Sequence, residues 1–326
     1  MTKRFLFCLL VISVLFIPVQ ASTIRWVDFA IPYESLKYAM DVDIETKDTE
    51  KHISWIEFLA VAGCRTGGKC GLQSVKTAAN DLKGDKSPEE LLGKLYKHYP
   101  YYYEAYEAVL GGLLGNFSIE RNGQKKFTYG LKAFSPIAAG YGYSHCSDFG
   151  NQRSFGFSRK HLGNDLMGSL GTPIAAVEGG TVEAMGWNRY GGWRIGIRSF
   201  DNKRYYYYAH LQKDRPFAPG LQVGDIVNAG DLLGFMGRTG YSDKENVNNI
   251  QTVHLHFGMQ LVFDEKQKEC DAEIWIDVYP IVKLLSHHRS SHHPLLGQHR
   301  HPRHLLRVRR SPSGGHLRYR LQYPGL

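Results

Sequence analysis

Three short patterns between residues 161 and 256 carry side chains that can bind a metal ion. His161 and Asp165 are four residues apart, His210 stands in a Tyr-Ala-His-Leu sequence, and a single leucine separates His254 from His256. A catalytic zinc ion takes three protein ligands from nitrogen, sulfur or oxygen donors and keeps a fourth position open for water. The residue types in these patterns therefore suit a catalytic zinc site.

The spacing within each pattern lets the side chains converge. A glycine-containing turn separates His161 from Asp165, so both side chains can reach one ion. Residues two apart on a strand point to the same face, so His254 and His256 would face the site together while their neighbours point into a core. Such a strand can present one histidine as a ligand and the other as a catalyst.

The distribution of histidine supports one shared site. Each pattern alone also arises by chance, as a surface histidine or a hydrogen-bonded core histidine. The chain has 15 histidines, and eight of them follow Ser286. Four of the other seven lie in the three patterns, a concentration that packing does not explain. The seven are His52, His98, His145, His161, His210, His254 and His256.

The order H-x-x-x-D, Y-x-H-L and H-x-H-F resembles the lysostaphin/LytM-type zinc metalloendopeptidases, family twenty-three of the metallopeptidases. The similarity covers about residues 134–285 and includes glycine-rich turns between the motifs. These are Gly171-Thr-Pro173 with the strand pair that follows it, Val223-Gly-Asp225, Ala229-Gly-Asp231 and Gly237-Arg-Thr-Gly240.

The resemblance implies a site and a substrate. His161, Asp165 and His256 would hold one Zn²⁺ per catalytic domain. His210 and His254 would serve the attacking water and the tetrahedral oxyanion, and the sequence does not say which histidine takes which part. The substrate class would be peptides of bacterial peptidoglycan, either cross-links or stem peptides. No nucleic-acid partner and no stable protein partner is indicated.

A tyrosine run, residues 205–208, precedes His210. Alternation along a strand would place Tyr206 and Tyr208 on the same face as His210, where they could line the substrate cleft. Tyr205 and Tyr207 would then pack behind it. An entirely buried run is the alternative.

Two regions of different composition suggest an α+β chain, a mainly helical N-terminal region followed by an antiparallel β-sheet catalytic domain. A length of 326 residues favours two domains. Residues 22–133 look mainly helical and have no evident role, whereas residues 134–286 contain short strands separated by glycine turns, typical of an antiparallel sheet. The expected strands include 174–177, 181–185, 193–197, 204–209 and 253–263.

Local signals mark elements of the helical region. Ser87 followed by Pro88 and Glu90 predicts a helix start, because serine caps, proline suits the first position and glutamate closes a capping box. Residues 52–62 form another apolar helix candidate. Asn122-Gly123 predicts the turn of a short hairpin. The tyrosine-rich stretch 99–106 is either a glycan-stacking surface or, as we favour, core.

Residues 1–21 read as a signal peptide: two basic residues, an apolar stretch and a small-residue cleavage site. The protein is therefore expected to be secreted or extracytoplasmic and associated with the cell wall. The apolar stretch is short for a membrane span. An uncleaved membrane anchor is the minor alternative.

The C-terminal tail, residues 287–326, has eight Arg and eight His but no Lys, Asp or Glu, so the net charge of +9 is concentrated there. It could contact an anionic wall polymer or membrane, or capture metal. We favour a disordered appendage without function, or the product of a shifted reading frame.

The cysteines allow a disulfide bond but no metal ligand. Cys64 and Cys70 flank a glycine-containing segment, and an extracytoplasmic protein could bridge them. No cysteine lies in the zinc motifs, so no thiolate ligand is expected.

A non-catalytic LytM-like regulatory or scaffold module is the main alternative function. A biotinyl- or lipoyl-type carrier is excluded, because Gly186 stands where the modified lysine would be.

Overall fold

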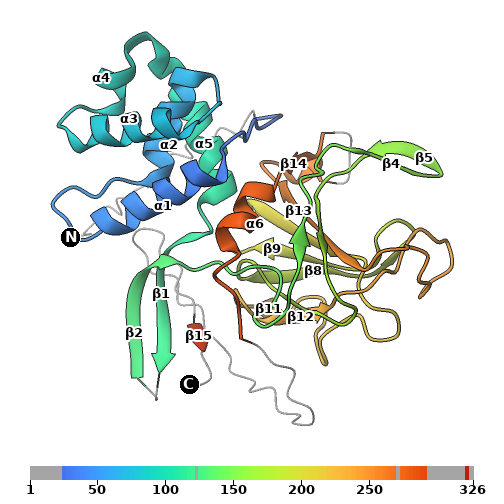
Figure 1. The fold of residues 1–326 in the computed structure, drawn as a ribbon. Helices are drawn as coiled ribbons and strands as arrows, with labels where there is room; N and C mark the ends of the chain where they lie inside the picture. Colours follow the sequence, from blue (N-terminus) through green and yellow to red (C-terminus); the bar gives the residue numbers. More distant parts are fainter. Residues whose placement is uncertain (1–23, 122–123, 269–271, 292–319, 323–326) are drawn as a thin grey trace, which may run out of the picture.

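The computed structural model describes residues 24–121, 124–268, 272–291 and 320–322. The expected signal peptide lies outside these residues. Helices of the N-terminal region gather on one side of the molecule and the large sheet lies on the other, with helix α6 (Tyr279–Leu285) between them (Figure 1). The expected α+β class, helices first and antiparallel sheet second, is confirmed.

The capping signal at Ser87 is confirmed. The Ser87 hydroxyl accepts a hydrogen bond from the Glu90 amide at 3.2 Å, and the Glu90 carboxylate accepts one from the Ser87 amide at 2.7 Å. The helix ends after five residues at Gly93, whose φ of +51° is left-handed, and a 3₁₀ turn follows. The N-terminal helical elements are α1 (Tyr33–Thr46), α2 (Trp55–Thr66), α3 (Leu72–Lys83), α4 (Pro88–Leu92), η1 (Gly93–His98) and α5 (Tyr99–Leu110).

A hairpin follows the helices, as Asn122-Gly123 predicts. Strands β1 (Leu114–Arg121) and β2 (Gln124–Leu131) pair antiparallel, and the two turn residues between them are outside the described ranges. Strand β15 (Arg320–Gln322) pairs in parallel with β1 and is the only part of residues 292–326 that the structure describes.

The sheet that carries the histidine motifs has the strand order β11-β8-β9-β10-β13-β6-β3, with β14 also paired to β13. Each described pairing in it is antiparallel. Two smaller pairs, β12 with β7 and β4 with β5, flank it. The strands are β3 (Ser144–His145), β4 (Gln152–Phe155), β5 (Phe157–Lys160), β6 (Asn164–Met167), β7 (Pro173–Ala175), β8 (Gly180–Asn188), β9 (Gly192–Ser199), β10 (Arg204–Ala209), β11 (Ile226–Val227), β12 (Leu232–Phe235), β13 (His254–Leu261) and β14 (Ile274–Ile276), and η2 (Glu265–Gln267) precedes β14.

The two faces of the sheet differ in character. Tyr206, Tyr208 and Phe257 point to one face, where all three are fully buried. Tyr207 and His256 point to the other face, where their rings lie 5.7 Å apart. We call these the core face and the histidine face. The core face is continuous with the apolar interior of the N-terminal helices, so helices and sheet share one hydrophobic core.

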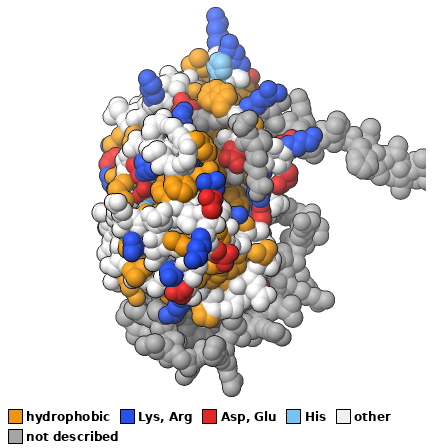
Figure 2. Space-filling model, turned by 90° about the vertical axis from the view of Figure 1, so that its right-hand side faces the viewer, with side chains coloured by type: hydrophobic (Ala, Val, Ile, Leu, Met, Phe, Trp, Pro, Cys, Tyr) orange, Lys and Arg blue, Asp and Glu red, His pale blue; other side chains and the backbone are white. Residues whose placement is uncertain are grey.

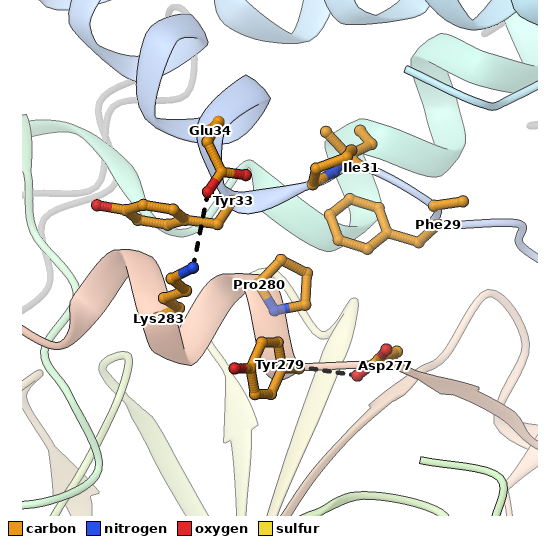
Figure 3. A pocket seen from close by; sticks show the side chains of 10 residues that line it. Phe29, Ile31, Tyr33, Glu34, Asp277, Tyr279, Pro280 and Lys283 are labelled. Atoms are coloured by element: carbon orange, nitrogen blue, oxygen red, sulfur yellow. Dashed lines mark hydrogen bonds and ion pairs between the residues drawn. The ribbon is translucent and has the colours of Figure 1, made fainter. Parts of the chain in front are cut away.

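Helix α6 and the N-terminal segment meet beside a small hollow (Figure 3). Lys283 of α6 forms an ion pair with Glu34 at 3.6 Å, and its ammonium lies 4.6 Å from the centre of the Tyr33 ring. The apolar side chains of Phe29, Ile31 and Pro280 complete the lining. This hollow lies at the junction of the helices and the sheet and contains none of the histidine motifs.

A buried ion pair also connects the two regions on the core face. Arg204 is 1% exposed, and its guanidinium donates to Glu178 at 2.8 Å, to Asp201 at 2.6 Å and to the Ala108 carbonyl of α5 at 2.7 Å. The Tyr206 hydroxyl donates to the same Glu178 carboxylate at 2.7 Å. The end of α5 is therefore hydrogen-bonded directly to β10.

The packed chain extends past Ser286, the expected end of the catalytic domain. The His288 ring stacks on Phe134 with centroids 4.4 Å apart, and its carbonyl accepts a hydrogen bond from the Ser135 amide. Ser290 is buried, and its carbonyl accepts from Ala139. The boundary expected at 286 is therefore several residues too early. The division at 133/134 stays a prediction.

Two further findings concern the helical region. Cys64 and Cys70 are buried free thiols, so the structure contains no bridge between them. The Cys70 thiol lies 3.4 Å from the Tyr106 hydroxyl, and Tyr106 is fully buried. Across the described ranges, no helix is both long and apolar enough to cross a membrane.

Candidate metal centre

His161, Asp165 and His256 bring three donor atoms together. Asp165 on β6 pairs directly with His256 on β13, and His161 lies just before β6. His161 Nε2 is 2.7 Å from His256 Nδ1 and 3.1 Å from Asp165 Oδ1, and His256 Nδ1 is 3.4 Å from Asp165 Oδ1. Antiparallel pairing thus joins two motifs that are about ninety residues apart in sequence.

These distances suit a metal ion. Ligand bonds of 2.0–2.2 Å to zinc place two tetrahedral donors about 3.3 Å apart, close to the spacings observed. Asp165 Oδ1 is buried and has no hydrogen-bond partner among the described residues. A buried carboxylate oxygen without a partner is costly, and a cation bound between the three side chains would remove that cost.

The electrostatics of the cluster are dominated by its carboxylates. Burial would lower the pKa of His161, but the neighbouring carboxylates of Asp148 and Asp165 outweigh burial and raise that pKa to about 9. Burial would raise the pKa of Asp165, but the neighbouring rings of His161 and His256 hold it well below its usual range. Burial lowers the pKa of His256. The carboxylate of Asp165 is therefore ionised, as a ligand must be.

Arg153 on β4 binds two carboxylates of the cluster. Its guanidinium donates to Asp148 at 2.5 Å and to Asp165 Oδ2 at 3.1 Å. Because Oδ2 is bonded in this way, the other oxygen of Asp165 is left facing the two histidines. His161 Nδ1 lies 3.1 Å from the Asp148 carbonyl, an acceptor, and 3.1 Å from Arg153 Nη2, a donor, while Nε2 faces Asp165 and His256.

His210 and His254 lie beside the three donors. Their ring centroids are 4.7 Å apart, and His210 is 5.9 Å from His256. Backbone carbonyls fix both tautomers: the Thr239 carbonyl lies 2.9 Å from Nδ1 of His210, and the Thr252 carbonyl 2.9 Å from Nδ1 of His254. Each ring therefore turns Nε2 away from the backbone. Burial lowers the pKa of His210 well below its usual value, as do the neighbouring histidines.

The expected position of Tyr206 and Tyr208 at the cleft is wrong. Both are fully buried on the core face: the Tyr206 hydroxyl donates to Glu178, and that of Tyr208 accepts from the Val177 amide. The expectation assumed that strand alternation continues to His210. Instead, His210 has a left-handed φ of +62°, which returns its side chain to the histidine face.

Three residues of the site were not predicted. Tyr207 contacts His256, the reverse of its expected position behind the cleft. The register of β10 against β13, which pairs Ala209 with His256, would have shown this, but the sequence does not specify that register. Asp148 and Arg153 belong to no motif, so no sequence signal marked them.

Comparison with known proteins identifies the domain around this site. Residues 159–271 match the family model described as Peptidase family M23. An L-Ala–D-Glu endopeptidase of Bacillus subtilis (strain 168) is 41% identical over 124 residues, which are 38% of this chain and 36% of the relative. Lysostaphin of Staphylococcus simulans is 37% identical over 98 residues, 30% of this chain and 17% of the relative. The matched part therefore spans about a third of the first relative and less than a fifth of the second.

The fold has a counterpart among solved structures. A candidate glycyl-glycine endopeptidase lytM from Ruminococcus gnavus superposes with a TM-score of 0.50 at 22% sequence identity, covering 82% of this chain and 93% of that one. The chain therefore contains a peptidase M23 domain, homologous to the Bacillus and Staphylococcus endopeptidases above.

Proposed function

We propose that the peptidase M23 domain of this chain is a zinc endopeptidase that hydrolyses peptide bonds of bacterial peptidoglycan, in cross-links or stem peptides, outside the cytoplasm. The observation that carries the proposal is the convergence of three donor atoms beside two further histidines; two of the donor residues are buried, and one donor is a carboxylate oxygen without a hydrogen bond in the described residues. The names of the related endopeptidases support the substrate class.

His161, Asp165 and His256 would hold the ion through Nε2, Oδ1 and Nδ1. When bound, zinc polarises the scissile carbonyl and lowers the pKa of its water to about 7. Arg153 and Asp148 keep the donor side chains of His161 and Asp165 oriented. Orientation of this kind reduces the reorganisation required when the transition state forms.

His210 and His254 would accept and donate protons during hydrolysis. Their Nδ1 protons are donated to backbone carbonyls, so Nε2 of each ring is the atom that can take a proton from the attacking water or contact the developing oxyanion. The closeness of the two rings places both near one substrate carbonyl. A purely regulatory module has no need for five such side chains in one place.

The test is digestion of purified peptidoglycan by the full chain, with zinc content measured on the same preparation. Digestion should stop when a chelator removes the metal and return when zinc is added back. Full digestion by protein that contains no metal would exclude a metal-dependent mechanism. Stoichiometric zinc without any digestion would favour the regulatory alternative.

A further inference from the structure

Hairpin β4–β5 brings a second arginine close to the metal centre. Arg153 on β4 lies directly opposite Arg159 on β5. Side chains opposite each other on paired strands are neighbours, and two like charges in such positions repel. Arg153 is neutralised by Asp148 and Asp165. No carboxylate of the described residues neutralises Arg159, so its positive charge remains beside the site.

Aromatic rings fix the position of Arg159. Its guanidinium carbon lies 4.7 Å from the centre of the Tyr190 ring and 5.3 Å from that of Tyr241. The Tyr241 ring is in turn 6.0 Å from His210. Nη1 of Arg159 is buried and makes no hydrogen bond within the described parts of the chain. The guanidinium is therefore held against the Tyr241 ring, beside His210, by contacts that leave Nη1 without a hydrogen bond.

Arg194 approaches the same place from the sheet. It lies on β9 on the histidine face, two residues from Gly196, which pairs with Tyr207. Its Nε is also buried and unpartnered among the residues described. Burial raises the pKa of Tyr207, while the charges of Arg194 and Arg159 act in the opposite direction, as expected for two cations near its hydroxyl. The Tyr207 ring contacts His256.

We propose that Arg159 and Arg194 form a carboxylate-binding subsite next to the scissile bond. Buried donors without acceptors destabilise a protein unless a ligand supplies the acceptors. A carboxylate fits a guanidinium best, because its two oxygens match the paired N–H groups. The subsite rests on the proposed function. It would make the enzyme prefer peptides with a free acidic group beside the cleaved bond to neutral glycine bridges.

The surface on the side of Arg159 and Arg194 is not uniformly basic. The side of the molecule on which β4 and β5 lie in Figure 1 shows basic, acidic and apolar side chains interspersed (Figure 2). Arg189 belongs to the same aromatic cluster, 5.3 Å from Tyr190, but it is paired with Asp243 at 3.2 Å. Arg189 is therefore a matched control for a charge that has a partner.

The experiment compares peptides that differ in one group. The full-length, zinc-loaded protein is given a stem peptide with a free D-Glu carboxylate, the same peptide with that group amidated, and a version amidated at its C-terminus instead. We expect kcat/KM to be about tenfold or more higher with the free D-Glu carboxylate, the effect of one charge-assisted contact. If kcat/KM were lower only for the peptide amidated at its C-terminus, the terminal carboxylate would be the ligand of the subsite.

Variants assign the preference to residues. The ratio between free and amidated peptide should fall to near one in the Arg159→Gln/Arg194→Gln double variant and remain high in Arg189→Gln. Dissociation constants of both peptides for zinc-loaded His254→Ala protein give a readout that needs no turnover. Equal binding and equal cleavage of charged and amidated peptides by the wild-type chain would overturn the subsite. Absence of cleavage with a preserved binding preference would overturn the proposed function alone.

Discussion

The sheet carries a buried polar cluster on each face, and the two clusters differ in how their charges are satisfied. On the core face, Arg204 is fully paired with Glu178 and Asp201, and Glu178 also accepts from Tyr206. On the histidine face, Asp165 retains a buried oxygen without a hydrogen bond. The first cluster is complete within the chain and connects α5 to the sheet. The second requires something from outside, which is characteristic of a binding site.

The largest expected effect comes from removing a donor on the histidine face. In His256→Ala, zinc content should fall far below one ion per chain, and turnover should drop by more than about 10⁴-fold, because the ion supplies both the nucleophile and the polarisation. The melting temperature of the metal-free protein should hardly change. Metal analysis and kinetics on one preparation measure this, with the exposed His98→Ala as control. A full complement of zinc in His256→Ala would remove it from the ligand set.

A smaller loss of rate is expected from the two proton-transfer candidates. His254→Ala and His210→Ala should each keep near-stoichiometric zinc and lose about 10²–10⁴-fold in turnover. The double variant should be little worse than the worse single one, because groups that act as a unit are not additive. If His254→Ala lost its metal while His256→Ala kept it, the assigned roles would be reversed.

On the core face, the expected effect is on stability. Glu178→Ala leaves Arg204 buried beside fewer acceptors, which should lower the free energy of unfolding by about 3–5 kcal/mol. Zinc bound per folded chain should be unchanged. Chemical denaturation measures the loss. Glu183→Ala is the matched control, because its pair with Arg198 is 2.7 Å long, against 2.8 Å for Arg204 and Glu178, but its carboxylate is 27% exposed. An equal loss in both variants would contradict the distinction.

Acid should lower the stability of the folded chain through His145 on the core face. Its ring lies 4.3 Å from Tyr279, and burial lowers its pKa to about 4. The unfolded chain, with a pKa of about 6.5, binds the proton first as the pH falls. The contribution of His145 to stability is therefore fully present above about pH 6.5 and is lost between there and pH 4, by roughly 3 kcal/mol. His145→Phe should show a shallower decline in unfolding titrations over this range; an identical decline would exclude His145 as the cause.

The smallest effect is expected at the C-terminus. Truncation after Ser291 should leave hydrolysis of a soluble peptide within a few-fold of the full chain, because no candidate ligand or proton-transfer residue follows His256. Truncation after Ser286 should instead lower the melting temperature, since it removes the contacts of His288 and Ser290. Loss of peptide hydrolysis in the longer, folded fragment would show that the tail takes part in catalysis.

The sequence predicted the elements better than the directions of side chains. Glycine turns and apolar runs located the strands, and the capping box located a helix start. Tyr206 and Tyr208 were misplaced because a single left-handed residue, His210, interrupts alternation, and no glycine or asparagine marks that position.

The supporting residues of the site escaped prediction for another reason. Asp148, Arg153 and Arg159 reach it through strand register and a hairpin, which are set by tertiary packing. Their spacing from the ligands in sequence carries no recurring pattern. A motif therefore identifies the atoms that bind the metal more readily than the atoms that orient them.

The hydrogen bond from Arg204 to the Ala108 carbonyl has a practical consequence for protein engineering. A fragment that begins near residue 134 would separate that guanidinium from α5 and expose the apolar surface that the helices cover. Gly112 lies against the carboxylate of Glu178 so closely that any side chain there would collide with it. The peptidase part of this chain is thus a poor candidate for transplantation as a portable module, and fusions should carry the helices with it.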